Sequence, residues 1–284
     1  MHWYSKYLTL FEKPFSDVPA TVVEEVKGKL QQMQSKNPIA SVVVIAHNEE
    51  TRLLSCLWSL SDNRCRYPVE IIGVDNNSSD RTGEVFEASG IPYFFEEQKS
   101  CGYARRCGLY NAKGKYYICI DSDTMYPPRY IETVIRELEK PGVVGVSSLW
   151  SFIPDKDHSK WGLKLYETVR DLYIRALFVN RPERGVRGMV FAYKTEYGRK
   201  EGYRVELKRG EDGSMALSLK KYGKIKLITT RKARAVTASN TLNADGSLFN
   251  SFKVRFIKGL KNIGFFFTRQ TKPPEDEESN LIKN

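Results

Sequence analysis

The sequence predicts an α/β fold in which a mostly parallel central sheet carries helices on both faces. Short runs rich in β-branched residues alternate with stretches whose apolar residues recur at helical spacing. The polar loops between them hold the Asn, Asp, Ser and Gly residues that start helices or make turns. A length of 284 residues, 41% of them hydrophobic, is enough for one large domain with appendages.

The first half of the chain alternates strictly between the two kinds of element. The predicted elements, in order, are strand 41–46, helix 53–60, strand 69–75, helix 81–89, strand 91–95, helix 103–112 and strand 116–121. Strands that alternate with helices at this spacing pair in parallel, because the helices serve as crossover connections. A further helix, with basic outer residues, is predicted at 163–179.

Both ends of the chain are expected to extend beyond the central domain. Residues 1–38 form an N-terminal helical extension, with a capped helix from Asp17 to Gln34. In residues 241–272, Phe and other apolar residues recur at near-helical spacing among lysines. Such a basic amphipathic helical segment either lies on an anionic membrane or packs on the domain or on a dimer partner. Residues 273–284 are predicted to be a disordered tail.

Charge is unevenly distributed along the chain. Residues 1–150 carry 17 Lys and Arg against 19 Asp and Glu, whereas residues 151–284 carry 28 against 15, which leaves the second half at +13. This imbalance indicates a phosphorylated substrate, an anionic membrane surface or nucleic acid as partner, or else a solvated basic surface. No nucleic-acid-binding motif is recognisable, so we expect no nucleic acid partner.

The remaining sequence features favour a cytoplasmic protein. No apolar stretch approaches the roughly 20 residues of a membrane span, and no signal peptide is evident. The five cysteines form no Cys-x-x-Cys pair and are odd in number, which fits a reducing compartment. We therefore expect a cytoplasmic location, with peripheral contact at the inner face of the membrane as an option.

Polar side chains follow three of the predicted strands at the point where each strand ends. They are Asn48 and Glu49 after the first strand, Asp75 and Asn77 after the second, and Asp121 and Asp123 after the fourth. The carboxyl ends of parallel strands meet at one edge of a sheet, where α/β proteins bind ligands. Two carboxylates at a strand end can converge on a hard cation, although Asp-Ser-Asp before two prolines is also an ordinary turn.

Four segments together resemble the nucleotide-binding half of family 2 glycosyltransferases. They are residues 42–50, 71–80, 102–114 and 116–123, and the resemblance runs from about residue 39 to about residue 230. It implies a GT-A fold over residues 39–240, with a nucleotide-binding half at 39–125 and an acceptor half at 126–240. It also implies transfer of a sugar from a UDP or GDP donor, with inversion at the anomeric carbon.

The resemblance assigns donor contacts to one set of residues. Ala46, His47, Asn48 and Glu49 would line the nucleoside, with Asp75 and Asn77 at the base, Arg105 at the base or diphosphate, and Asp121 at the ribose or a metal-bound water. A carboxylate at position 75 suits an imino N–H because it can only accept hydrogen bonds. Asp123, together with Asp121, would bind Mg²⁺ or Mn²⁺, which prefer oxygen ligands.

The acceptor side carries the remaining implied roles. Asp212 would be the base that takes the proton from the acceptor hydroxyl, and Glu211 would orient it or contact the acceptor. Both acids also suit a helix N-terminus on electrostatic grounds alone. Gly188 would let substrate approach the backbone, and Trp150 would border the site unless it packs in the core.

The chain departs from the family pattern in one region that matters for the metal. Many relatives place a further histidine ligand beyond the Glu-Asp helix, but residues 229–239 contain none. The metal would then have fewer protein ligands, or Arg231, Lys232 or Arg234 would help to hold the diphosphate.

We therefore expect a metal-dependent, inverting glycosyltransferase that acts on a glycan or lipid-linked acceptor in polysaccharide or glycoconjugate synthesis. One alternative is a polyprenyl-phosphate glycosyltransferase at the membrane surface, whose acceptor oxygen is already ionised and needs Asp212 less. A nucleotidyltransferase is a weaker alternative, because the Gly-rich phosphate loop it needs after the first strand is absent. A basic nucleic-acid-binding domain is the last alternative.

Overall fold

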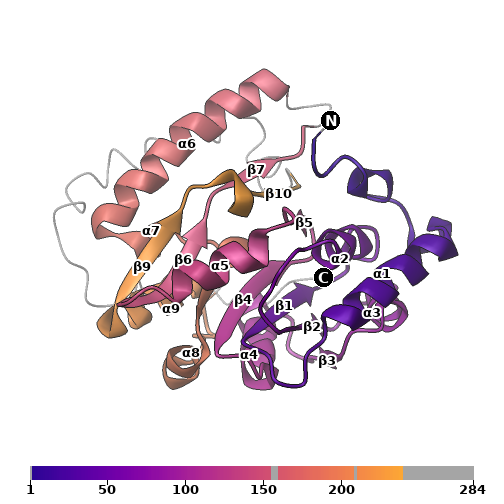
Figure 1. Ribbon diagram of the computed structural model, residues 1–284, viewed down its shortest axis with the longest axis horizontal. Coiled ribbons are helices and arrows are strands. Elements are labelled where there is room, and N and C mark those ends of the chain that lie inside the picture. The colour runs from indigo at the N-terminus through magenta and orange to yellow at the C-terminus, as the bar shows by residue number, and fades with distance from the viewer. Residues whose placement is uncertain (1, 155–158, 208–209, 239–284) are drawn as a thin grey trace.

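The computed structural model describes residues 2–154, 159–207 and 210–238. Its main feature is a seven-stranded sheet in the order β3-β2-β1-β4-β8-β6-β9, with helices on both faces (Figure 1). The predicted fold class is thus confirmed for these residues. The predicted amphipathic segment at 241–272, and with it the C-terminal helical extension, lies outside the described residues, as does the tail at 273–284.

The first half of the sheet is parallel, as predicted. β1 pairs in parallel with β2 on one side and with β4 on the other, and β3 extends the sheet beyond β2. The elements are β1 (Ala40–Ala46), α2 (Leu53–Ser61), β2 (Val69–Asp75), α3 (Thr82–Ser89), β3 (Tyr93–Phe95), α4 (Cys101–Asn111) and β4 (Tyr116–Asp121). β3 is two residues shorter than predicted, and Pro92, which has no N–H to donate, stands just before it.

The second half of the sheet is mixed. β8 is antiparallel to both β4 and β6, and β9 is parallel to β6. A second, three-stranded sheet has the order β5-β10-β7. The strands are β5 (Thr124–Met125), β6 (Val143–Ser148), β7 (Trp150–Phe152), β8 (Phe191–Lys194), β9 (Lys224–Ile228) and β10 (Ala235–Thr237), and the helices are α5 (Tyr130–Leu138), α6 (Lys160–Asn180), α7 (Pro182–Gly185), α8 (Thr195–Glu201) and α9 (Glu211–Leu219).

The N-terminal helix begins later than the sequence predicts. α1 spans Ala20–Met33, and Asp17 belongs instead to a short 3₁₀ turn, Phe15–Asp17. Val18 is extended, as the residue before a proline usually is, and Pro19 occupies the N-cap position without a side-chain cap. The other 3₁₀ turns are Tyr7–Thr9, Gly188–Val190, Lys220–Tyr222 and Arg231–Ala233. Among the described helices, none combines the length and apolar character that crossing a bilayer requires.

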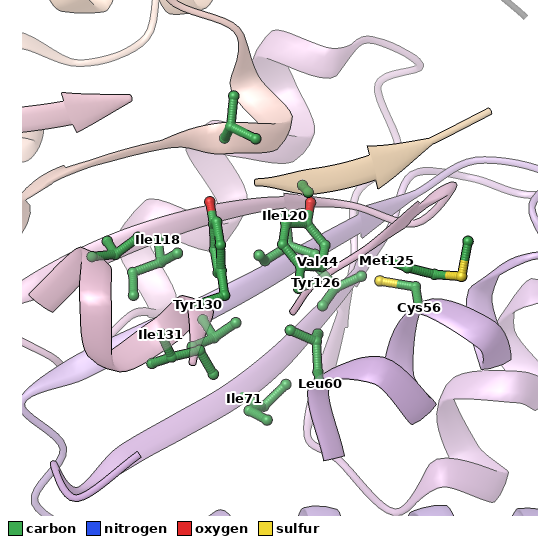
Figure 2. Packing of buried hydrophobic residues seen from close by; sticks show 14 of the residues in the cluster. Val44, Cys56, Leu60, Ile71, Ile118, Ile120, Met125, Tyr126, Tyr130 and Ile131 are labelled. Atoms are coloured by element: carbon green, nitrogen blue, oxygen red, sulfur yellow. The ribbon is translucent and has the colours of Figure 1, made fainter. Parts of the chain in front are cut away.

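Two hydrophobic cores lie on the two faces of the sheet. Val44 of β1 belongs to the core that α1, α2, α3 and α5 cover, whereas its neighbour Val43 belongs to the core covered by α4 and α9. This alternation follows from the two-residue period of a strand. Figure 2 shows part of the first core, in which Ile118 and Ile120 of β4 lie close to Tyr126 and Tyr130. Helices on both faces leave only the strand ends of the sheet open to ligands.

A buried carboxylate holds the parallel strands together at the end of the sheet away from their carboxyl termini. Glu70 of β2 accepts hydrogen bonds from the Ser41 hydroxyl at 2.5 Å and from the Lys113 backbone N–H at 2.6 Å. Ser41 accepts in turn from the Gly114 N–H at 2.8 Å. The turn before β4 is thereby fixed to both β1 and β2.

Replacement of Glu70 by Ala should lower the free energy of unfolding by about 1–3 kcal/mol, because it leaves the buried Ser41 hydroxyl and Lys113 N–H without an acceptor. Urea denaturation followed by circular dichroism measures the loss. The control Glu70→Gln keeps one carbonyl oxygen at this place and should lose less. An unchanged midpoint for Glu70→Ala would show that the network adds no stability.

Candidate active site

The strand ends of β1, β2 and β4 lie level with one another. Their register pairs Ala46 with Asp75 and Ile45 with Asp121, so the residues that follow these strands share one edge of the sheet. The sequence predicted this meeting of polar strand ends. Because β1 is central between the other two, its following loop lies beside both Asp75 and Asp121.

The loop after β1 is fixed by hydrogen bonds to the loop after β2. The His47 ring Nδ1 lies 2.8 Å from the Asn76 carbonyl oxygen. The Asn48 side-chain oxygen accepts from the Ser79 N–H at 2.7 Å, and the Asn48 N–H donates to the Ser78 hydroxyl at 3.0 Å. Asn48 has φ 53°, a left-handed conformation that asparagine tolerates better than most residues. Asn48, which the sequence predicts as a donor contact, therefore also fixes the shape of this loop.

Asp75 and Asn77 end the neighbouring strand in a similar way. Asp75 is buried and accepts from the Ser78 N–H at 3.1 Å. Asn77 has φ 55° and donates its side-chain N–H to the Glu97 carbonyl at 2.9 Å. These bonds hold the backbone at the end of β2, so the Asp75 carboxylate has a defined position at the sheet edge.

Three carboxylates, those of Glu49, Asp121 and Asp123, influence one another beside β4. Burial, followed by the charge of Asp123, raises the pKa of Glu49 to about 7. Burial, followed by the charge of Asp121, raises the pKa of Asp123 to about 6. Arg52 approaches Glu49 only to 3.5 Å. Negative charge is therefore in excess here, an arrangement that suits a divalent cation.

The predicted metal ligands Asp121 and Asp123 fit such a cation as a partial ligand set. Among the residues that the structure describes, no three His, Cys, Asp or Glu side chains are grouped as a protein-only metal site. Mg²⁺ usually binds through one or two carboxylates, with water and substrate phosphates as its other ligands. Two carboxylates at this strand end are sufficient for a site of that kind.

Residues 229–239, which contain no histidine, nevertheless contact the Asp123 side chain through Thr237. β10 pairs with β5 next to the Asp-Ser-Asp turn. The Thr237 hydroxyl lies 2.9 Å from the Thr124 hydroxyl and 3.4 Å from Asp123 Oδ1. Thr124 donates to the same Asp123 oxygen at 3.0 Å. The sequence held no signal for Thr237, because this contact spans more than a hundred residues.

Arg105 occupies a different place from the one expected at the base or diphosphate. Its side chain is 2% exposed, and its guanidinium lies between two carboxylates, 2.6 Å from Asp121 and 3.1 Å from Asp212. Burial alone lowers the pKa of this guanidinium, but Asp212 and Asp121 raise it well above its usual value. Arg105 therefore stays charged and holds the two acids.

The predicted base lies at the N-terminus of α9. Asp212 is buried, and burial raises the pKa of its carboxyl while Arg105 opposes the rise. Burial, followed by the charge of Asp212, raises the pKa of Glu211 to about 7. A carboxylate with a raised pKa is a better proton acceptor. Through Arg105, Asp212 is linked to the Asp121 side of the site.

Gly188 also differs from its predicted role. A Cβ atom here would collide with Arg105 Nη2 and with Asp212 Oδ2, so the space of the missing side chain is already filled by the buried ion pair. Residues 188–190 form a 3₁₀ turn, and β8 begins directly after it at Phe191. The glycine permits the ion pair and not a close approach of substrate.

Trp150 packs in the core. The sequence left this open, because the residue could also have bordered the acceptor site. It is 5% exposed, and the Arg170 guanidinium lies 4.3 Å from its ring centroid. One ring face is thus covered by a cation and not available to a sugar. Arg234, expected as a candidate for the diphosphate, is also engaged here, by Asp171 and by the Trp150 carbonyl.

Comparison with known proteins identifies the family. Residues 41–200, more than half of the chain, match the model of glycosyl transferase family 2. The chain belongs to this family. An uncharacterized glycosyltransferase of Rickettsia prowazekii is 29% identical over 133 residues, which cover 45% of this chain and 41% of that protein. Glycosyltransferase GlyA of Streptococcus pneumoniae is 27% identical over 146 residues, which cover 49% of this chain and 20% of that protein. The chain thus matches less than half the length of these relatives.

Solved structures show the same fold as this family 2 chain. The mannosyltransferase PcManGT of Pyrobaculum calidifontis, in complex with GDP-Man and Mn²⁺, superposes with a TM-score of 0.55 at 16% identity over 90% of this chain and 76% of that one. Residues 1–349 of Staphylococcus aureus TarS, in complex with UDP-GlcNAc, give 0.52 at 19% identity over 70% and 58%. The GT-A fold implied by the sequence resemblance is therefore confirmed.

Replacement of Gly188 by Ala should destabilise this family 2 chain by about 1–3 kcal/mol, because the added methyl group displaces Arg105 or Asp212 from a packed site. Thermal and urea denaturation measure the loss. The matched control is Gly28, inside α1, where an added Cβ would meet nothing within 4 Å. Gly28→Ala should be neutral or stabilising by up to about 1 kcal/mol. Equal stability of the two variants would contradict the packing described at Gly188.

Proposed function

We propose that this chain transfers a sugar from a UDP- or GDP-linked donor to a glycan or lipid-linked acceptor, with inversion at the anomeric carbon and with Mg²⁺ or Mn²⁺ as cofactor. The single observation that carries the proposal is the position of Asp212. One buried guanidinium, that of Arg105, joins this acid to Asp121 at the end of β4. The Arg105 side chain therefore lies between the candidate base and the candidate cation site.

The donor half of the proposal rests on the ends of β1, β2 and β4. Asp75 accepts a hydrogen bond from the nucleobase, and the loop from Ala46 to Glu49 lines the nucleoside. Asp121 and Asp123 would hold the divalent cation, which would offset the negative charge of the departing diphosphate. The excess of negative charge around Glu49 and Asp123, evident in their raised pKa values of about 7 and about 6, supports a cation at this place.

The acceptor half of the proposal rests on the start of α9. Asp212 accepts the proton from the acceptor hydroxyl as that oxygen attacks the anomeric carbon. Attack from the α9 side, with the diphosphate leaving toward β4, inverts the configuration at that carbon. Glu211 contacts the acceptor or keeps Asp212 in position. Arg105 acts as a positioning residue, because it touches both acids while its own side chain is buried.

UDP or GDP should raise the melting temperature of the chain more with Mn²⁺ than with EDTA, because a ligand that binds only the native state stabilises it by mass action. Thermal-shift measurements with each nucleoside diphosphate test this directly. In Asp123→Asn the Mn²⁺-dependent part of the shift should disappear. The matched control is Asp80→Asn, an acid in the loop before α3 that lies outside the proposed metal site. Absence of any nucleotide-dependent shift in the unaltered protein would contradict the proposed donor.

Replacement of Asp212 by Asn should reduce turnover by about 10²–10⁴-fold, the usual contribution of a general base, while nucleotide binding is retained. Nucleoside diphosphate release measures turnover, and the thermal shift with Mn²⁺ and nucleotide measures binding. Little loss of turnover would contradict the base role and would favour an acceptor whose oxygen is already ionised, such as a polyprenyl phosphate.

A further inference from the structure

Helix α6 is apolar on two opposite faces, and the described chain covers only one of them. Its inner face is buried and consists of Leu163, Tyr166, Ile174 and Leu177. Its outer face exposes four large apolar side chains, which we call the outer stripe: Trp161 at 81%, Leu165 at 70%, Leu172 at 64% and Val179 at 78%. At 3.6 residues per turn these four lie within about 40° of one another. In a helix of a globular protein, an apolar face is normally covered by another part of the protein or by a partner.

The outer stripe is long and lies at the periphery. Figure 1 shows α6 along the outer edge of the molecule, with its inner side toward β6 and β7. From Trp161 to Val179 the stripe extends about 27 Å at 1.5 Å per residue. Isolated exposed apolar residues are common, but a continuous stripe of this size marks an interaction surface.

The charges on α6 indicate what kind of surface it meets. The exposed charged side chains of the helix are Lys160, Lys164 and Arg175, all of them basic. Both acids of the helix are engaged with the protein instead. Glu167 accepts from the Phe152 N–H at 2.7 Å, and Asp171 lies 2.8 Å from Arg170. The outer face of α6 therefore combines apolar and positively charged groups.

We propose that the outer stripe of α6 binds an anionic lipid surface, lying in the interface and not across the bilayer. A helix of this composition sinks its apolar side chains into the boundary between head groups and acyl chains, and its Lys and Arg contact acidic head groups. Charge complementarity selects this occupant. A second copy would set like charges of Lys164 and Arg175 against each other, and the chain's own segment 249–267 is also basic, with four Lys and Arg and no acid.

Helix α6, which carries this surface, is connected through α7 to the proposed active site. Phe178, near the end of α6, lies against Gly185 of α7, and Gly188 lies three residues further on against Asp212. Binding at α6 would hold the acceptor side of the site near the lipid surface. In this respect the inference rests on the proposed function, since it assigns the acceptor to the lipid-linked class.

Trp161 is a built-in reporter for the test. Of the four tryptophans, Trp58 and Trp150 are buried and Trp3 is partly buried, whereas Trp161 is 81% exposed. The full chain is mixed with vesicles of phosphatidylcholine alone, or with equal parts of phosphatidylcholine and phosphatidylglycerol. We expect sedimentation with the mixed vesicles only, a blue shift of the fluorescence, and quenching by brominated acyl chains. Trp161→Phe should remove the shift and the quenching.

Two double variants separate the apolar from the charged contribution. Leu165→Gln with Leu172→Gln should lower the vesicle partition coefficient by at least about tenfold, because two apolar side chains no longer enter the lipid. Lys164→Gln with Arg175→Gln should lower it by about tenfold or more on the mixed vesicles. The matched control is Tyr110→Ser, which removes an aromatic side chain that is 59% exposed on α4 and should leave binding unchanged.

Three results would overturn the proposal. They are no sedimentation with either vesicle, sedimentation without quenching of Trp161, and shielding of Trp161 from iodide before vesicles are added. In the last case, a dimer mass would identify a second copy as the occupant, and a monomer mass would identify the chain itself.

Nucleotide-dependent stabilisation should be the same in the Leu165 and Leu172 double variant as in the unaltered protein. Failure of the lipid test is therefore distinguishable from failure of the proposed transferase function.

Discussion

The buried Arg105 guanidinium organises the centre of this structure. A charge in a protein interior is tolerated only with close partners of opposite sign, and here the partners are Asp121 and Asp212. These acids come from β4 and α9, which lie far apart in the sequence, and the arginine comes from α4. The need to neutralise one side chain thus fixes how the two halves of the chain meet. Position 188 has to be glycine for the same reason.

The distribution of charge around this cation is asymmetric. Asp121 and Asp212 share the guanidinium. Within the described part of the chain, Glu49 and Asp123 have no equally close basic partner, and Arg52 lies 3.5 Å from Glu49. Their raised pKa values report this repulsion together with burial. The proposed divalent cation would relieve this repulsion, and its affinity would fall as these carboxylates take up protons. The charges of Glu49 and Asp123 are therefore less fully compensated than those of the two acids that share Arg105.

The sequence predicted the parallel half of the fold well, because local signals were strong there. β2 and β4 have the predicted bounds, and the polar ends of β1, β2 and β4 share an edge as expected. The second half could not be predicted in the same way, since β8 is antiparallel to β4 and β6 and β10 joins a separate sheet. At the site, the residue types indicated which strand ends meet at one edge. The partners of Arg105, the packing of Gly188 and the contact of Thr237 depend on segments that are distant in the sequence.

The pairing of β5 with β10 has a consequence for folding during translation. Thr237 and Asp123 are 114 positions apart, and β10 is the last strand of the described chain. Strands β1 to β4 can assemble while later residues are still being translated, because their contacts are closer in sequence. The Thr237 hydroxyl, which contacts Asp123, is translated more than a hundred residues after Asp123 itself. A nascent chain can thus hold a folded sheet of β1 to β4 well before β10 is available to pair with β5 beside the Asp-Ser-Asp turn.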